Sequence, residues 1–140
     1  RTVRSLVYLL AKYDGVEMFF VSPARLKIGK DIKAYLGRHG ILYREMERWD
    51  TMLQKIDVLY QTRIQKERFK NAHEYKKFKG KYILTLNEVQ KMKNDSIIMH
   101  PLPRVDEIAP SVDASPKAVY FNQARYGLLV RMALLKLVLK

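Results

Sequence analysis

Short, unbroken apolar runs separated by helix-like segments are the feature that most constrains how this 140-residue chain can fold. Buried strands are expected at residues 18–21, 58–60 and 97–99, where every side chain is apolar or aromatic. Weaker strand candidates follow at 41–43 and 82–84. Strands that are apolar on both faces and alternate with helices are typical of a parallel sheet covered on both sides. The sequence therefore predicts a single α/β domain with three α/β/α layers and a mainly parallel sheet.

Helices are expected where apolar residues recur every three or four positions, or where a capping signal occurs. These criteria predict helices at residues 3–10, from an N-cap at Ser22 to Gly37 or Gly40, at 51–56, from the Thr85–Glu88 capping box to Met92, and at about 117–139. Residues 61–81 have no clear period, so a long loop with one helical turn is expected there. Loops of this length in compact domains are usually functional or mobile.

The net charge of +13 raises the question of a nucleic-acid partner. The positive excess is spread evenly, with +7 over residues 1–70 and +6 over residues 71–140. The densest basic patch is Lys76, Lys77, Lys79 and Lys81, interleaved with Tyr75, Phe78 and Tyr82, whose rings could stack on single-stranded bases. A solvated basic loop with its aromatic rings turned to the core is the simpler interpretation. Scattered positive charge also suits an enzyme that attracts anionic substrates.

Several common chemistries lack their sequence signals. The chain has no cysteine, which excludes disulfides and thiol nucleophiles, and its three histidines share no metal-ligand spacing. No glycine-rich phosphate loop or G-x-S-x-G nucleophile motif is present. The carboxylates Asp106 and Glu107 are adjacent, so they are expected to point apart in solvated or capping roles rather than to form an acid–base pair. No apolar run approaches the roughly 20 residues that span a bilayer.

The segment after the predicted strand 97–99 is rich in free carbonyl groups. It reads His-Pro-Leu-Pro-Arg, and the prolines at 101 and 103 have no N–H and restrict the backbone around them. Open α/β sheets bind ligands at the carboxyl ends of their strands. A rigid row of acceptors there could bind substrate N–H groups, although a stiff strand exit with no ligand explains the same pattern equally well.

The segment after the predicted strand 58–60 carries a candidate anion clamp. Arg63 and Gln65 alternate, so they would share one face of an extended stretch. Arg63 could hold a carboxylate with its two-pronged guanidinium group while Gln65 adds an amide contact. The residue types are generic, however, and a surface salt-bridge cluster with residues 66–68 is the alternative.

These two segments and the chain ends resemble one family. The stretches Arg-Thr-Val-Arg-Ser-Leu at the start, Thr-Arg-Ile-Gln-Lys-Glu-Arg-Phe at 62–69, His-Pro-Leu-Pro-Arg-Val-Asp-Glu-Ile at 100–108 and Arg-Met-Ala-Leu-Leu at 131–135 resemble the C-terminal, aspartate-binding half of aspartate carbamoyltransferase. The sister ornithine carbamoyltransferases typically have cysteine at the position of Pro101. The resemblance implies a Rossmann-like sheet in one half of a two-domain carbamoyltransferase, whose carbamoyl-phosphate half is absent from this chain.

The resemblance assigns roles in L-aspartate binding. It implies that Arg1 and Arg63 hold the carboxylates of aspartate and that Gln65 lies near the aspartate amine. It also implies that Arg68 ties the substrate loop into a closed form.

The resemblance assigns further roles to the proline-rich segment. The backbone carbonyls of Pro101 and Leu102 would accept hydrogen bonds from the carbamoyl N–H₂ group and the attacking amine, and Pro103 would close the loop. The implied reaction is attack of the aspartate amine on carbamoyl phosphate, which gives carbamoyl aspartate and phosphate for pyrimidine biosynthesis. Such a site works by positioning and charge stabilisation, so no general acid or base, metal or cofactor is expected.

The resemblance also implies an assembly. The parent enzyme would be a cytoplasmic homotrimer, with an organelle as the alternative location, formed through the missing half and able to join regulatory subunits or other pyrimidine enzymes. Because the chain opens without Met and lacks the carbamoyl-phosphate ligands, we expect a fragment that has no turnover by itself.

Two other function classes remain open at this point. A basic nucleic-acid-binding module would act through Lys76–Lys81 and lose affinity steeply with salt. A structural or regulatory relic would keep the fold without the site, although the presence of Arg63, Gln65 and residues 100–104 argues against it.

Overall fold

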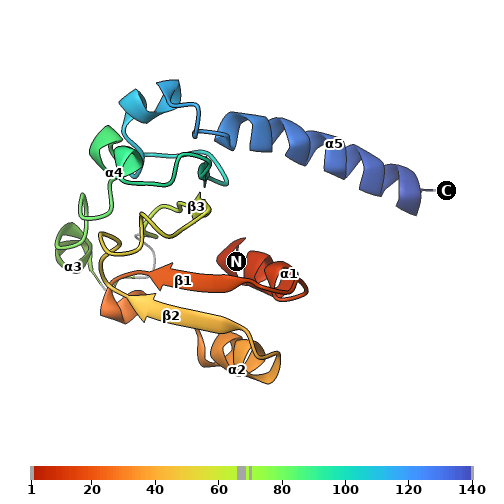
Figure 1. The fold of residues 1–140 in the computed structure, drawn as a ribbon, viewed down its shortest axis with the longest axis horizontal. Helices are drawn as coiled ribbons and strands as arrows, with labels where there is room; N and C mark the ends of the chain where they lie inside the picture. The colour runs from red at the N-terminus through yellow and green to blue at the C-terminus, as the bar shows by residue number, and fades with distance from the viewer. Residues whose placement is uncertain (1, 66–68, 70, 140) are drawn as a thin grey trace. The chain divides into compact units, whose positions relative to one another are not determined.

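The computed structural model describes residues 2–65, 69 and 71–139, which fall into two compact units. The first unit ends at Thr51 and the second begins at Met52. Both units combine helices with parallel strands, so the predicted α/β class is confirmed (Figure 1). The long helix predicted at the C-terminus is present, and in the part of the chain that the structure describes no helix is both long and apolar enough to cross a membrane.

The first unit contains one two-stranded parallel sheet and the helices that follow and precede its strands. Its elements are helix α1 (Thr2–Leu10), strand β1 (Glu17–Val21), the short 3-10 helix η1 (Ala24–Leu26), helix α2 (Lys30–Arg38) and strand β2 (Leu42–Met46). Strands β1 and β2 pair in register from Glu17 opposite Leu42 to Val21 opposite Met46. The right order of helix and strand was predictable because each apolar run is short and each helical stripe is regular.

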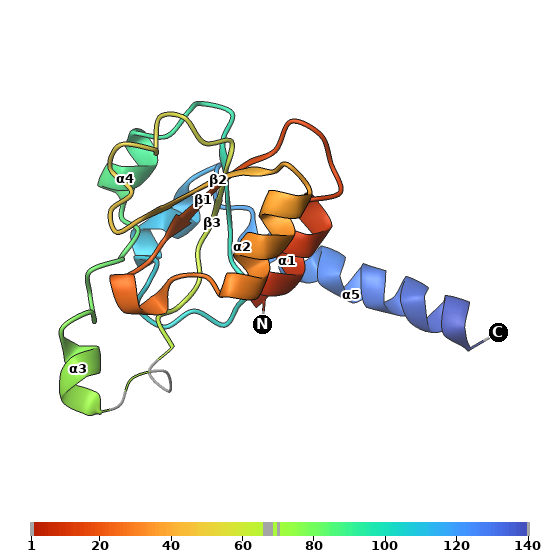
Figure 2. The ribbon, with the colours of Figure 1, turned by 90° about the horizontal axis from the view of Figure 1, so that it is seen from below.

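The core of the first unit forms where the apolar stripes of α1 and α2 meet β1. Val7 and Ala11 from the α1 side, Met18 from β1, and Ile32 and Leu36 from α2 are buried together. The two helices lie side by side, and the rings of Tyr8 and Tyr35 meet edge to face with their centroids 4.5 Å apart (Figure 2).

The predicted N-cap at Ser22 is wrong. Pro23 instead precedes the separate 3-10 turn η1, and α2 begins later, at Lys30, after Gly29 as its N-cap residue. A proline fixes φ at a value that suits a 3-10 turn as well as an α-helix, so the sequence signal could not distinguish the two. The helix ends at Arg38, between the two glycines proposed as its stop, and Gly40 has a positive φ of 65°.

The second unit holds the other parallel strand pair and the segments that follow it. Its elements are strand β3 (Val58–Tyr60), helix α3 (Ala72–Lys76), helix α4 (Leu86–Gln90), strand β4 (Ile97–Met99), the 3-10 helix η3 (Pro110–Ala114) and helix α5 (Tyr120–Val138). Strands β3 and β4 pair in parallel, with Leu59 opposite Ile98. The core includes the buried residues Leu53, Leu59, Leu84, Ile98, Ile108, Val112 and Tyr120.

Two short elements predicted in this unit differ from the structure. Residues 51–55 form consecutive turns where a helix was predicted at 51–56, and the strand predicted at 82–84 is reduced to one parallel bridge between Leu84 and Ile108. Both segments bury apolar side chains without needing a regular element, since Leu53 and Leu84 are fully buried. By contrast, the Thr85–Glu88 capping box is present as predicted and begins α4.

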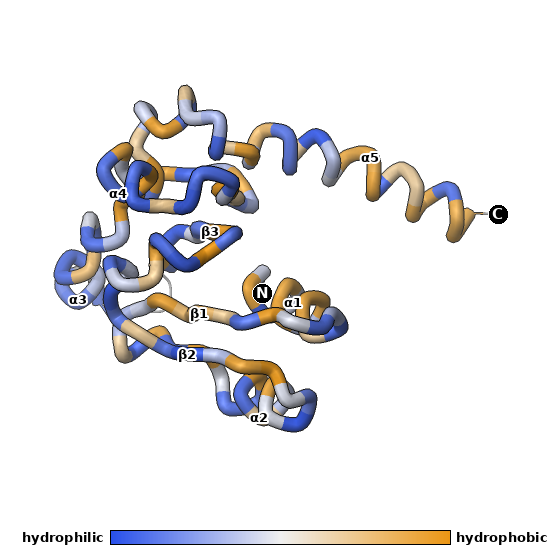
Figure 3. Tube along the Cα trace, in the orientation of Figure 1, coloured by the Kyte–Doolittle hydropathy of each residue, from blue (hydrophilic) through white to orange (hydrophobic). Residues whose placement is uncertain are grey.

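Helix α5 extends away from the rest of its unit, and apolar residues recur along its whole length (Figures 1 and 3). Tyr120 at its start is fully buried, but the apolar residues beyond it are exposed. These are Phe121, Tyr126, Leu128, Leu129, Val130, Met132, Leu134, Leu135, Leu137 and Val138. A helix that is apolar on most of its surface is normally buried against another part of a protein.

Candidate active site

The two chemically informative segments leave neighbouring strands at the same edge of the β3–β4 sheet. Because β3 and β4 are parallel and Tyr60 is opposite Met99, both chains emerge at their carboxyl ends side by side. The pairing continues one residue further, since the Gln61 amide donates to the Met99 carbonyl at 2.9 Å. Residues 61–65 and 100–104 therefore start from adjacent points, at the edge where parallel α/β sheets bind ligands.

Gln61 ties this edge to the segments around it. Its side chain is buried, and its Nε2 atom donates to the Tyr82 carbonyl at 2.9 Å and to the Glu107 carbonyl at 3.5 Å. The Glu107 carbonyl also accepts from the Leu84 amide at 2.9 Å. A single buried amide thus joins the exits of β3 and β4 to residues 82–84.

The carbonyl-rich segment has an unusual backbone at its centre. Leu102 has a φ of +39°, in the left-handed region that a non-glycine residue rarely adopts, and the bond between Leu102 and Pro103 is cis. Holding Leu102 at a positive φ costs on the order of 1–3 kcal/mol and persists only where the surroundings enforce it. The Leu102 amide donates to Nδ1 of His100 at 2.9 Å, and this hydrogen bond helps to hold Leu102 at its positive φ.

The structure describes part of the predicted aspartate clamp. Arg63 is exposed and Gln65 is half-buried, and both follow directly from the end of β3. Pro101 and Pro103 are exposed and Leu102 is half-buried beside them. Arg1 and Arg68 lie outside the described residues. The roles of all these residues remain predictions.

A buried pair that the sequence reasoning missed lies beneath the carbonyl-rich segment. Nε2 of His100 is 2.7 Å from a carboxylate oxygen of Glu107, and the two residues are only 2% and 5% exposed. Glu107 is therefore not solvated, although its carboxylate does accept backbone N–H groups as the capping alternative expected, whereas Asp106 is exposed. The two residues are seven positions apart with two prolines between them, and only the reversal of the loop brings them together.

The charge of Glu107 is stabilised although the residue is buried. Burial raises the pKa of this carboxyl group, but backbone N–H groups of the loop and the His100 ring outweigh that effect and hold the pKa below its ordinary value. The amides of Val105 and Asp106 each donate to the second carboxylate oxygen at 3.1 Å. Glu107 is thus an acceptor for three donors of one loop.

A second cluster anchors the far end of the same segment. Arg104 forms an ion pair with Asp113, and the hydroxyl of Tyr120 donates to the same carboxylate. Burial, followed by the nearby Asp113 carboxylate, raises the pKa of Tyr120 to about 12. From α5, the Gln123 side chain accepts from the His100 amide at 2.9 Å. The start of α5 therefore holds both ends of residues 100–104.

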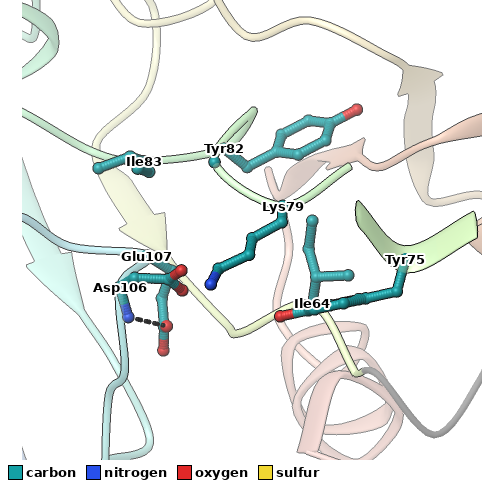
Figure 4. Close-up of a pocket in the computed structure, with 8 residues that line it drawn as sticks. Ile64, Tyr75, Lys79, Tyr82, Ile83, Asp106 and Glu107 are labelled. Carbon is teal, nitrogen blue, oxygen red and sulfur yellow. Dashed lines mark hydrogen bonds between the residues drawn. The ribbon is translucent and has the colours of Figure 1, made fainter. Parts of the chain in front are cut away.

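The basic patch forms a wall of a shallow depression beside the site. This depression contains about 260 Å³ of empty space, part of it open to solvent, and is lined by Ile64, Tyr75, Lys79, Gly80, Tyr82, Ile83, Asp106 and Glu107. The Lys79 side chain extends toward Asp106 and Glu107 (Figure 4).

The aromatic rings of the patch contact each other. Phe69 lies 5.7 Å from both Tyr75 and Phe78 between ring centroids, and Lys81 lies over the Phe78 ring at 5.4 Å. The lysines at 76, 77, 79 and 81 are exposed. This arrangement matches a solvated basic loop whose aromatic side chains pack together, not a row of open stacking platforms.

In the described part of this edge, possible metal ligands are not clustered. Among residues 2–65, 69 and 71–139, no group of three or more His, Asp or Glu side chains is placed to hold a metal ion. What the edge offers is a set of backbone carbonyls, an amide side chain and an exposed guanidinium group, which can bind and orient a substrate.

Comparison with known proteins identifies the family. The model of the aspartate/ornithine carbamoyltransferase Asp/Orn binding domain matches residues 1–138. Aspartate carbamoyltransferase 2 of Pisum sativum, a chloroplastic protein, is 53% identical over 140 residues, covering 99% of this chain and 36% of its own. The aspartate carbamoyltransferase catalytic subunit of Methanocaldococcus jannaschii is 53% identical over 136 residues, covering 97% of this chain and 44% of its own.

Solved structures agree with the sequence relatives. The catalytic subunit of the M. jannaschii aspartate transcarbamoylase superposes with a TM-score of 0.88 at 52% identity, over 97% of this chain and 44% of that one. The Trypanosoma cruzi enzyme, solved with carbamoyl phosphate and aspartate, gives a TM-score of 0.84 at 38% identity, over 96% of this chain and 45% of that one. The fold is that of a carbamoyltransferase. The chain belongs to the aspartate/ornithine carbamoyltransferase family and spans less than half the length of these relatives.

Proposed function

We propose that this chain is the aspartate-binding half of an aspartate carbamoyltransferase, which transfers the carbamoyl group of carbamoyl phosphate to L-aspartate. The products would be N-carbamoyl-L-aspartate and phosphate, in de novo pyrimidine biosynthesis. The observation that carries the proposal is the 53% identity with aspartate carbamoyltransferases along almost the whole chain. The convergence of residues 61–65 and 100–104 at one sheet edge supports it.

We assign the binding of L-aspartate to the exit of β3. Arg63 binds a carboxylate, because a guanidinium group can donate two parallel hydrogen bonds to it, and Gln65 lies near the amine. Arg1 holds the other carboxylate and Arg68 draws the substrate loop closed. The exposure of Arg63 at the end of β3 supports this assignment, since a substrate can reach it.

We assign the carbamoyl group to the exit of β4. The carbonyls of Pro101 and Leu102 accept hydrogen bonds from the carbamoyl N–H₂ group and from the attacking amine, and Pro103 closes the loop. Pro101 and Pro103 have no N–H, and the N–H of Leu102 is bonded to His100, so no donor from these three residues competes for the acceptors. The protein then accelerates the reaction by holding two substrates in line and by matching developing charge.

The remaining carbamoyl-phosphate ligands belong, in this proposal, to a second half of the protein outside residues 1–140. The exposed apolar surface of α5 supports the proposal of a second half. A further part of the protein that covered α5 would bury its apolar side chains between Phe121 and Val138. The parent protein would be a homotrimer formed through the second half, able to assemble further with regulatory subunits or other pyrimidine enzymes. We place it in the cytoplasm or in an organelle, and five plant relatives are named as chloroplastic proteins.

The acceptor preference of the full parent protein tests this proposal. With carbamoyl phosphate supplied, we expect product with L-aspartate and a rate at background level with L-ornithine. Carbamoyl aspartate and citrulline can be measured in the same reaction by chromatography. A preference for ornithine, or no transfer to either amino acid by a folded parent protein, would refute the proposed function.

A further inference from the structure

Residues 100–107 close around a buried His–Glu pair whose hydrogen bonds leave one consistent arrangement of protons. The Leu102 amide is a donor, so Nδ1 of His100, 2.9 Å away, must be an acceptor without a proton. The ring proton is then on Nε2, which donates to Glu107 at 2.7 Å. Glu107 therefore selects the tautomer of His100 that can hold Leu102, just as a carboxylate fixes the tautomer of a histidine elsewhere in protein chemistry.

The contact at Leu102 also sets the direction of a neighbouring carbonyl. The peptide bond between Pro101 and Leu102 is trans and planar, so its N–H and C=O groups point in opposite directions. Because the N–H points into the loop at His100, the Pro101 carbonyl points away from the buried pair. The positive φ of Leu102 shows that the backbone would not take this course by preference.

We propose that His100 is a positioning residue for the carbamoyl-transfer step: its Nδ1 atom holds the Leu102 amide and thereby aims the Pro101 carbonyl at the substrates, while Glu107 keeps His100 in the required tautomer. This inference rests on the proposed function, because it needs that carbonyl to be an acceptor. His100 itself touches no substrate in this scheme, since its ring is 2% exposed and both nitrogens are bonded within the loop.

Two substitutions at His100 separate the two nitrogens. The amide oxygen of asparagine can take the position of Nδ1, so His100→Asn keeps an acceptor for Leu102 and loses the contact with Glu107. The longer His100→Gln keeps a donor for Glu107 and loses the acceptor for Leu102. Glu107→Gln presents a donor to the ring and favours the other tautomer, whose Nδ1–H opposes the Leu102 amide.

The kinetic test uses the full parent protein with these variants. We expect His100→Asn to keep kcat within about threefold of wild type, and His100→Gln and Glu107→Gln to lower kcat by about 10- to 100-fold, the loss expected for misplaced groups. The KM for aspartate should change by less than about threefold in all of them, because Arg63 is untouched. Tyr120→Phe, which removes the hydroxyl bonded to Asp113, is the control for general loosening of the segment.

The outcomes separate the inference from the proposed function. Equal kcat losses in His100→Asn and His100→Gln, or losses that follow the thermal midpoint as in Tyr120→Phe, would overturn the positioning role while leaving the enzyme assignment intact. An inactive wild-type parent would instead overturn the proposed function. If a variant fails to fold, ¹⁵N NMR of the wild-type protein decides: a ring proton on Nε2 of His100 is expected, and a proton on Nδ1 would refute the inference.

Discussion

Residues 100–107 and helix α5 lie close together in the sequence, but they differ in how their side chains are packed. In residues 100–107 the buried side chains of His100 and Glu107 pair with each other at 2.7 Å, while Gln61 and Gln123 bond the backbone of the loop from outside it. In α5 the apolar groups beyond Tyr120 are exposed, with Leu135 59% accessible. The buried side chains of the loop are therefore paired, whereas the apolar side chains of the helix beyond Tyr120 are left uncovered. One segment of the described chain thus has its buried polar side chains hydrogen-bonded, while another leaves an apolar surface exposed.

The largest expected effect is the loss of enzymatic turnover in the isolated chain compared with the parent protein. If the second half supplies the other carbamoyl-phosphate ligands, residues 1–140 alone should give no carbamoyl aspartate above background, while the parent protein turns over. Purified chain and parent can be compared at equal concentration in the same assay. Steady turnover by the chain alone would show that the half-site is already a complete site.

The apolar surface of α5 gives the next largest effect. We expect Leu135→Ala to destabilise the parent protein by about 2–5 kcal/mol, the usual cost of truncating a buried leucine. In the isolated chain the same change should cost within about 0.5 kcal/mol, because the side chain is exposed there. Chemical denaturation of both proteins measures the contrast. Equal effects in the two contexts would mean that nothing covers this helix.

The loop and the helix should also differ in their response to acid. The pKa of Glu107 lies below its ordinary value of 4.5, so its contribution to stability is present above that pH and is lost as the pH falls through the lower, folded-state pKa. Helix α5 contains no Asp or Glu.

We therefore expect the thermal midpoint of wild type to approach that of Glu107→Gln as the pH falls below 4.5. The Leu135→Ala difference should not change over the same range, which makes that variant the control. Scanning calorimetry at several pH values measures both. A Glu107→Gln difference that is constant with pH would show that its carboxylate contributes no pH-linked stability.

The smallest effect is expected at the basic patch. Replacing Lys76, Lys77 and Lys81 by glutamine should change kcat/KM of the parent by less than about twofold, because these side chains are solvated and the neighbouring rings pack on each other. Binding to single-stranded RNA at physiological salt should be negligible for both proteins. Tight, salt-sensitive RNA binding that the triple substitution abolishes would instead favour a nucleic-acid-binding module.

Features of the fold that are set by adjacent residues could be predicted from the sequence, whereas features that are set by distant contacts could not. The apolar runs at 58–60 and 97–99 and the Thr85 capping box were predictable because each is defined by adjacent residues. The helix predicted at 51–56 and the strand at 82–84 were wrong, because burial of Leu53 and Leu84 depends on contacts from elsewhere and does not require a regular element.

The candidate site shows the same difference between features set by adjacent residues and features set by distant contacts. Arg63 and the carbonyl-rich segment could be proposed from the sequence because each directly follows a recognisable strand. The His100–Glu107 contact could not, since it exists only after the loop has reversed direction. Spacing along a chain identifies local chemistry, but it does not show which buried polar groups will meet.

Arg63, the proposed clamp for the L-aspartate carboxylate, is the residue whose substitution is most informative. We would measure carbamoyl-aspartate formation by the full parent protein, comparing wild type, Arg63→Ala and the exposed control Arg38→Ala on α2. Loss of a desolvated charge contact costs about 2–5 kcal/mol, so kcat/KM for aspartate should fall on the order of 30-fold or more in Arg63→Ala alone, with folding unchanged. Equal activity in all three proteins would contradict the account, because the family fold would then be present without the proposed site.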